Sequence, residues 1–196
     1  MRLTRSGRRG ATTLAGRADT DAELWARGDD DAFGELYDRH AEAVWNHAYR
    51  LTGSWSTAED LTSGTFLTAW RRRHAVKLVR DSALPWLYTV TGYLAAGELR
   101  RTTRFGRLLR RVPLDDTVRD HADQVATSVD NDRELRSVMA AVARLPKGER
   151  EAVELVLIGE VPVAEAAVVL GLAEASVRSR ISRARGRLRA SLEEMG

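Results

Sequence analysis

Arginine and serine side chains gather near the C-terminus at a spacing suited to contacts with DNA. Residues 178–189 contain six arginines within twelve positions, and three serines stand among residues 176–182. The planar guanidinium of arginine pairs with phosphate oxygens and with guanine edges, and a serine hydroxyl bonds to either kind of partner. The chemistry predicted by these groups is recognition of double-stranded DNA, without a covalent step.

Helical periodicity separates these polar groups from the apolar stripe of a single helix: the serines and Arg183 lie opposite the stripe, and Arg178 lies on one shoulder of it. At about 100° per residue, a helix over 174–192 puts the apolar side chains within one third of its circumference: Val177, Ile181, Ala184, Leu188 and Leu192. A shorter expected helix, 162–170, precedes it, and Gly171 lies in the turn between them. This order matches a helix-turn-helix, whose second helix enters the major groove. We therefore predict DNA contacts from Ser176, Arg178, Ser179, Arg180, Arg183 and Arg187.

An ordinary basic surface helix is the alternative interpretation of 174–192. It leaves six arginines directly behind a helix-turn signal unexplained, so we favour the DNA-reading helix.

A second surface suited to nucleic acid is expected in the first half of the chain, where basic and aromatic residues alternate. Unpaired bases need stacking platforms beside a cationic track, and each stacked base contributes about 1–3 kcal/mol. The candidates are Lys77, Arg80, Trp86, Arg100 and Arg101. Taken singly, Trp86 is better explained as a core residue, because it shares a helical stripe with Val90 and Leu94.

Residue types that would support catalysis or metal binding are not arranged for either. The chain has no cysteine, and its four histidines show no ligand spacing. The acidic run Asp29–Asp31 is explained by helix capping. We therefore predict no enzymatic activity, no cofactor and no metal.

Seven helices are expected to position these surfaces, and no strand-like alternation is found. Their ranges are 31–52, 57–73, 85–101, 132–145, 149–158, 162–170 and 174–192. The helix over 57–73 has two apolar faces, which indicates either a partner on one side or burial on both. The predicted fold is all-α, with two small helical domains joined by a flexible linker.

Changes of charge along the chain mark the predicted domain boundaries. Residues 1–18 form a basic tail that is expected to be disordered, and 19–101 form the first domain. Residues 102–131 pass from an arginine cluster to an aspartate cluster and are read as the linker, and 132–196 form the second domain. The formal net charge of the 196 residues is +3, and no run of about 20 apolar residues is present, so we expect a soluble, cytoplasmic protein with no membrane contact.

The order of several short motifs resembles the extracytoplasmic-function sigma factors of the sigma-70 family. In the first domain these are Asp31-Ala-Phe-Gly-Glu-Leu-Tyr-Asp-Arg-His40, Arg50-Leu-Thr-Gly53, Ala58-Glu-Asp-Leu61, Thr65-Phe-Leu-Thr-Ala-Trp70 and Pro85-Trp-Leu-Tyr88. In the second they are Ala143-Arg-Leu-Pro146, Leu170-Gly171 and Ser176-Val-Arg-Ser-Arg-Ile-Ser-Arg-Ala-Arg185. The resemblance covers nearly the whole chain apart from the tail and the linker.

This resemblance implies a division of labour between the two domains. Asp60, Phe66 and Trp70 would dock on the clamp helices of the largest subunit of bacterial RNA polymerase core. The loop and helix that carry Lys77, Arg80, Trp86, Arg100 and Arg101 would hold the opened −10 strand of promoter DNA. The helix over 174–192 would read the −35 element. An anti-sigma factor would be a second protein partner, and the free chain would be a monomer.

The sequence departs from the family pattern at a few positions. Ser63 and Gly64 replace a glutamine and a glutamate, and glycine inside a helix costs about 1 kcal/mol against alanine. Gly92, Tyr93 and Gly97 stand where polar residues are common. Pro162 and Ala173 replace serine caps.

Two hypotheses from different classes follow, and dependence on polymerase separates them. The first is a promoter-specificity subunit that acts only with core polymerase. The second is a free-standing helix-turn-helix regulator, which would bind its DNA tightly without polymerase.

Overall fold

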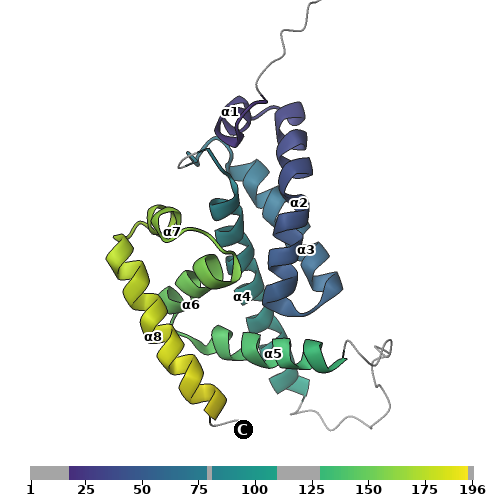
Figure 1. Ribbon diagram of the computed structural model, residues 1–196. Helices are drawn as coiled ribbons and strands as arrows, with labels where there is room; N and C mark the ends of the chain where they lie inside the picture. The colour runs from purple at the N-terminus through teal and green to yellow at the C-terminus, as the bar shows by residue number, and fades with distance from the viewer. Residues whose placement is uncertain (1–17, 79–80, 110–128, 194–196) are drawn as a thin grey trace, which may run out of the picture.

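The computed structural model describes residues 18–78, 81–109 and 129–193, and in this part of the chain the helices are joined by turns and irregular segments, with no strand (Figure 1). The helices are α1 (Asp21–Arg27), α2 (Asp30–Thr52), α3 (Trp55–Arg72), α4 (Leu84–Leu109), α5 (Val129–Arg144), α6 (Lys147–Val153), α7 (Val163–Leu170) and α8 (Glu174–Glu193). A π-helical segment, η1 (Glu154–Ile158), continues directly from α6. The all-α fold class is confirmed.

The first helix, α1, is a correction to the sequence analysis, which treated residues 19–30 as polar and non-helical. Its seven residues are too few to show a periodic stripe, but both ends carry capping signals. The Thr20 hydroxyl accepts from the N–H of Glu23 while the Glu23 carboxylate accepts from the N–H of Thr20, and Gly28 ends the helix in the left-handed conformation.

Helices occupy both ends of the region predicted as a linker. Helix α4 continues eight residues beyond Arg101, to Leu109, and α5 begins at Val129 rather than near Asp132. Arginine and leucine are good helix formers, and residues 102–109 contain no proline to stop the helix. Residues 110–128 and the predicted basic tail through residue 17 lie outside the described part.

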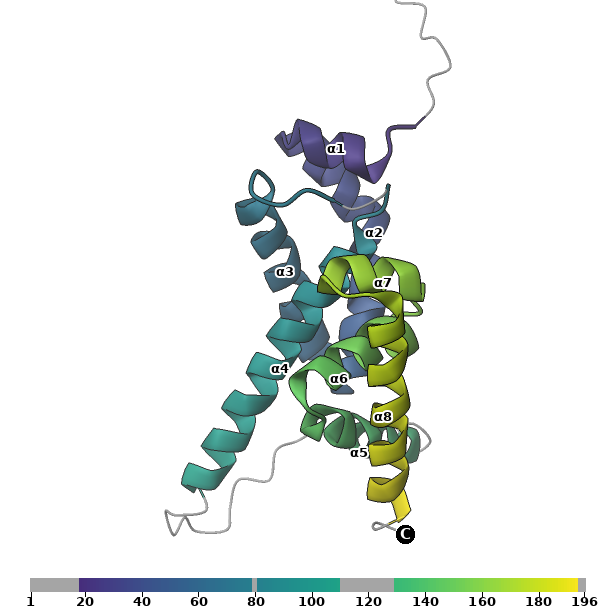
Figure 2. The ribbon, with the colours of Figure 1, turned by 90° about the vertical axis from the view of Figure 1, so that its left-hand side faces the viewer.

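Helices α2, α3 and α4 pack as a three-helix bundle with α1 across one end (Figures 1 and 2). Helices α5 to α8 form a second group, in which α6 and α7 lie between α4 and the outer helix α8 (Figure 1). Figure 2 shows α8 running along the outside of this group.

The two groups share one hydrophobic core. The same cluster of buried side chains contains Leu36 and Leu87 from the first group and Leu155, Val161 and Val177 from the second. Burying a leucine or valine side chain contributes about 1.5–3 kcal/mol. The sequence analysis expected two small helical domains joined by a flexible linker and did not say whether they touch; in this structure the two groups pack against each other.

Polar contacts join the same two groups at the edge of the shared core. The Arg50 guanidinium of α2 donates to the backbone oxygen of Ile158 at 2.8 Å. The Tyr93 hydroxyl of α4 donates to the carboxylate of Glu151 at 3.0 Å, and the Lys147 ammonium lies over the Tyr93 ring. Tyr93, one of the departures from the family pattern, therefore belongs to the contact between the groups.

Candidate nucleic-acid interface

Helices α7 and α8 meet at the turn that was expected from the sequence. Gly171 has φ 65°, and its N–H is hydrogen-bonded to backbone oxygens of α7. The apolar stripe of α8 points inward, since Val177, Ile181 and Ala184 are all buried. Pro162 begins α7 without a side-chain cap, as its residue type requires.

The predicted DNA-reading residues lie on the polar part of the circumference of α8, outside its buried stripe. Five of the six are exposed, and Arg180 is partly buried: Ser176, Arg178, Ser179, Arg180, Arg183 and Arg187. From Ser176 to Arg187, these arginines and small hydroxyl groups extend over about 17 Å of the helix axis.

Acidic and carbonyl groups from within the second group hold several of these arginines. Glu174 pairs with Arg178 one turn along α8, at 2.6 Å. On α6, the carboxylate of Glu149 lies 3.4 Å from Nε of Arg183 and 3.1 Å from Nε of Arg187. The sequence analysis did not identify Glu149 as part of the site, because the contact joins two helices more than thirty residues apart.

Gly148 was also missed, and it makes room for a third arginine. The Arg180 guanidinium donates to the Gly148 backbone oxygen at 3.4 Å. A Cβ at position 148 would lie 2.7 Å from Nη1 of Arg180, so a larger residue there would displace the guanidinium.

The second predicted surface is divided between two places. Lys77 is exposed in the segment between α3 and α4, and Trp86 is near the start of α4. Arg100 and Arg101 are exposed on the same helix, but about 20 Å further along its axis at 1.5 Å per residue. Arg80 lies outside the described residues.

Trp86 is partly buried against Trp25 of α1, with their ring centroids 5.3 Å apart in an edge-to-face arrangement. This packing agrees with the interpretation of Trp86 as a core residue. It leaves part of the ring accessible.

Helix α1 anchors both ends of the segment that carries Lys77. The Trp25 indole N–H donates to the backbone oxygens of Arg73 and Val76, at 3.1 and 3.0 Å. At the other end, the Asp21 carboxylate accepts from the backbone N–H of Ala83 at 2.8 Å. The short helix that the sequence analysis missed therefore positions a segment that it did identify.

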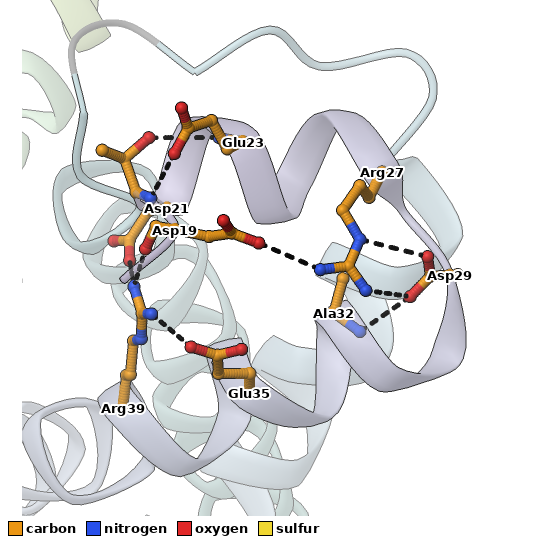
Figure 3. Close-up of polar contacts among 9 residues, drawn as sticks. Asp19, Asp21, Glu23, Arg27, Asp29, Ala32, Glu35 and Arg39 are labelled. Atoms are coloured by element: carbon orange, nitrogen blue, oxygen red, sulfur yellow. Dashed lines mark hydrogen bonds and ion pairs between the residues drawn. The ribbon is translucent and has the colours of Figure 1, made fainter. Parts of the chain in front are cut away.

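Asp21 is itself held by a buried polar network. Burial alone would raise the pKa of the Asp21 carboxyl, but hydrogen bonds from His40, Ala83 and Arg39 outweigh it and the pKa is lowered. Figure 3 shows Arg39 reaching from α2 to both Asp21 and Glu35, and Arg27 joining Asp19 to Asp29. These contacts fix α1 against the start of α2.

The residues predicted to bind polymerase differ in their exposure. Asp60 is exposed on α3, but Phe66 is buried against Phe33 and Tyr37 of α2. Trp70 is partly buried against Phe33, and the Arg73 guanidinium lies 3.5 Å from its ring centroid. Phe66 thus serves the packing of α2 on α3.

Tyr37 and Leu67 supply exposed apolar surface next to these residues. They are 45% and 48% exposed on α2 and α3, and the Tyr37 ring lies 4.7 Å from that of Phe66.

The departure from the family pattern at Gly64 has a packing reason, because a Cβ there would approach the Leu94 side chain of α4 to 3.2 Å.

The described residues contain no cluster of three or more histidine, cysteine, aspartate or glutamate side chains that could hold a metal ion. Among the helices described, none is long and apolar enough to cross a bilayer.

Comparison with known proteins identifies two sequence regions. Residues 36–105 match sigma-70 region 2, and residues 135–188 match sigma-70, region 4. The chain is 32% identical over 163 residues to the ECF RNA polymerase sigma factor SigL of Mycobacterium tuberculosis, which covers 82% of this chain and 89% of SigL. It is 32% identical over 185 residues to SigM of the same species, covering 91% and 88%.

Solved structures agree with these relatives. The structure of CnrH in complex with the cytosolic domain of CnrY matches with a TM-score of 0.59 and 26% identity, covering 91% of this chain and all of that one. The sigma factor RpoE of Bartonella quintana, bound to the anti-sigma factor NepR, matches in fold with a TM-score of 0.51 and 23% identity, covering 82% of this chain and 96% of that one.

Proposed function

This chain belongs to the extracytoplasmic-function sigma factors of RNA polymerase, and from that premise we propose how its surfaces divide the work of promoter recognition. As a sigma factor it directs transcription initiation with core polymerase. The match to both sigma regions favours this function over the free-standing regulator.

Helix α8 is the proposed reader of the −35 element, through Ser176, Arg178, Ser179, Arg180, Arg183 and Arg187. The observation that carries this proposal is the pairing of a buried apolar stripe with an exposed arginine and serine face on one helix. Arginine donors suit guanine edges in the major groove, and the surrounding guanidiniums suit phosphates.

The opened −10 strand is the proposed ligand of the first domain. Lys77, Arg80 and Trp86 would act at one end of α4, and Arg100 and Arg101 further along it. The support is the exposed basic side chains at both places and the two-sided anchoring of the segment by α1. The factor would hold the strand without making or breaking a bond in it.

Core polymerase is the proposed partner of the outer face of α2 and α3. Asp60 and Trp70 would contact the clamp helices of the largest subunit, together with the exposed Tyr37 and Leu67. Phe66 would act indirectly, by supporting Tyr37 from beneath.

An anti-sigma factor is the proposed second partner. CnrH, which resembles this chain, was solved with the cytosolic domain of CnrY bound to it. We expect a protein of that kind to compete with core polymerase for the chain in the cytoplasm.

The test of the proposed function is reconstitution with bacterial core polymerase. We expect co-purification of the two, and start-site-specific transcripts in run-off assays on genomic fragments. Tight, sequence-specific binding of DNA by the chain alone, with no effect on transcription, would contradict the proposal. Arg183→Ala and Leu67→Ala should impair promoter choice and polymerase binding, respectively.

A further inference from the structure

Two of the outward-facing arginines of α8 share one carboxylate. Glu149, in the first turn of α6, has one oxygen 3.4 Å from Nε of Arg183 and the other 3.1 Å from Nε of Arg187. The Glu149 side chain is only 8% exposed, while those of Arg183 and Arg187 are 57% and 60% exposed. The acid therefore lies beneath the arginines, on the side away from solvent.

The atoms used in these contacts leave the outer ends of the arginines available. Both arginines meet Glu149 through Nε, the guanidinium nitrogen nearest the backbone. The two Nη groups at the far end are the ones that make paired hydrogen bonds to a guanine edge or a phosphate. Nη1 of Arg183 also donates to the Ser179 hydroxyl at 2.8 Å, which fixes the plane of that guanidinium.

Electrostatic attraction stabilises the contact between Glu149 and the two arginines. Arg183 and Arg187 are one helical turn apart, and like charges at this spacing repel. Arg180 is a third cation on the same helix, lying on the backbone oxygen of Gly148. A carboxylate as buried as that of Glu149 is costly without a cationic partner. The single negative charge of Glu149 between the two arginines reduces their mutual repulsion and also gives the buried carboxylate its cationic partners.

We propose that Glu149 is a positioning residue for promoter recognition, which holds Arg183 and Arg187 in the orientation that α8 presents to DNA. This inference rests on the proposed −35 function of α8. A long arginine side chain loses rotational freedom when it binds, and one already fixed has less to lose. Fixed orientation favours the base pair whose acceptors match it, so Glu149 increases discrimination between sequences more than total affinity.

A purely structural role for Glu149 makes a different prediction. Acidic residues in the first turn stabilise a helix through its dipole, and this role requires only the charge. Aspartate keeps the charge at position 149, but it is one methylene shorter and cannot span both arginines. Glu149→Asp therefore separates positioning from helix stabilisation, and Glu149→Gln removes the charge at constant length.

The experiment uses the full chain assembled with core polymerase. Binding is measured to a promoter fragment defined by run-off transcription and to the same fragment with its −35 element scrambled. We expect Glu149→Asp and Glu149→Gln each to reduce the ratio of the two dissociation constants at least fivefold, mainly by weakening binding to the intact promoter. The Asp variant should unfold at a somewhat lower temperature, because its buried carboxylate is drawn away from the arginines, but it should bind core polymerase like the wild type. Glu193→Gln, in the exposed last turn of α8, removes one charge as the control and should keep the ratio.

A second measurement does not depend on DNA. In the free, isotope-labelled chain, the Nε–H signal of Arg183, which donates a hydrogen bond to Glu149, should exchange slowly with water, and Glu149→Asp should make it exchange faster. An Asp variant with the wild-type ratio, or an equal loss of affinity for both fragments, would overturn the inference. A wild-type chain that does not discriminate the fragments contradicts the −35 function itself, whereas unchanged exchange in the Asp variant contradicts only the role of Glu149.

Discussion

The side chain of Glu154 in η1 packs directly against Gly92 of α4, at the contact between the two helical groups. A Cβ on Gly92 would lie 2.6 Å from Oε2 of Glu154, so only glycine admits the carboxylate at its present place. Burial raises the pKa of Glu154 to about 7 from its ordinary 4.5, with Arg150 lowering it and Glu151 raising it. The packed arrangement therefore favours the protonated acid.

The first prediction concerns the pH dependence of stability through Glu154. Because its pKa is higher in the folded than in the unfolded chain, folding binds a proton, and its contribution to stability is lost as pH rises from about 4.5 through about 7. Glutamine mimics the neutral acid at every pH. We expect Glu154→Gln to be more stable than the wild type by about 1 kcal/mol at pH 5 and by about 3 kcal/mol at pH 8. Urea unfolding at both pH values measures this, and equal differences at pH 5 and pH 8 would contradict it.

The second prediction concerns Gly159, where the second group packs on the first. A Cβ there would lie 2.8 Å from Cδ2 of Tyr88 and 2.9 Å from the backbone oxygen of Leu155. Neither atom can move cheaply, so we expect Gly159→Ala to lower the free energy of unfolding by about 1–3 kcal/mol. Gly97→Ala is the matched control, because its nearest neighbour would be 3.9 Å away. The control should gain up to about 1 kcal/mol from helix propensity.

Sequence patterns predicted the long helices because each has a periodic apolar face. The inward stripe of α8 and the turn at Gly171 were identified for this reason. Helix α1 was missed because seven residues are too short for a period, although its capping residues at Thr20 and Gly28 were readable. An apolar stripe also does not show which element packs against it, so the sequence could not predict whether Phe66 is buried against α2 or binds a partner.

Contacts between helices distant in sequence could not be predicted from a single chain. Nothing in the residue types of 147–151 indicates that Glu149 lies beneath Arg183. The shared core could not be predicted for the same reason. Leu87 and Leu155 each belong to an apolar stripe, but their place in one core depends on how the chain folds in three dimensions. The arginine face of α8 was predictable, and the acid that supports it was not.

The third prediction concerns His47, which is fully buried on α2 against the Tyr88 ring, with 4.2 Å between centroids. Neither ring nitrogen has a hydrogen-bond partner, and burial, assisted by Arg50, lowers the pKa of His47 to about 3. As pH falls below about 6.5, His47 therefore binds a proton in the unfolded chain but not in the folded chain, and the folded state loses stability.

His47→Leu removes this titration. At pH 7.5 we expect a stability close to that of the wild type, because the lost ring contact is offset by the loss of two unpaired nitrogens. The variant's advantage should grow by about 2 kcal/mol between pH 7.5 and pH 5. Urea unfolding at the two pH values is the measurement, and a constant difference would show that His47 is charged or partnered in the folded chain.

The fourth prediction concerns the anchor of the segment that carries Lys77. Trp25→Phe keeps an aromatic ring beside Trp86 but removes the N–H that binds the backbone of Arg73 and Val76. Each lost hydrogen bond costs about 1 kcal/mol. On a polymerase complex, promoter opening should fall several-fold, as measured by permanganate reactivity, while binding of the −35 duplex stays unchanged.

Trp55→Phe provides the control for this substitution, because the Trp55 side chain is 65% exposed and its N–H binds only the nearby Glu59. Equal losses of opening in the two variants would mean that Trp25 has no special role in positioning the segment.

The last prediction is that the two helical groups separate when the chain binds promoter DNA with polymerase. The −10 and −35 elements are about 25 base pairs apart, roughly 85 Å at 3.4 Å per pair. With α8 about 30 Å long and packed through α6 and α7 onto α4, the closed chain cannot reach both elements.

The chain has no cysteine of its own, so fluorophores that react with thiols will label only the cysteines introduced by substitution. Energy transfer between labels at Glu42→Cys and Ala190→Cys should be high in the free chain and low in the promoter complex, whereas a Glu42→Cys and Ser56→Cys pair within the first group should not change. Unchanged transfer in the first pair would mean that the shared core survives on the promoter, and that −10 and −35 contacts cannot both come from one chain.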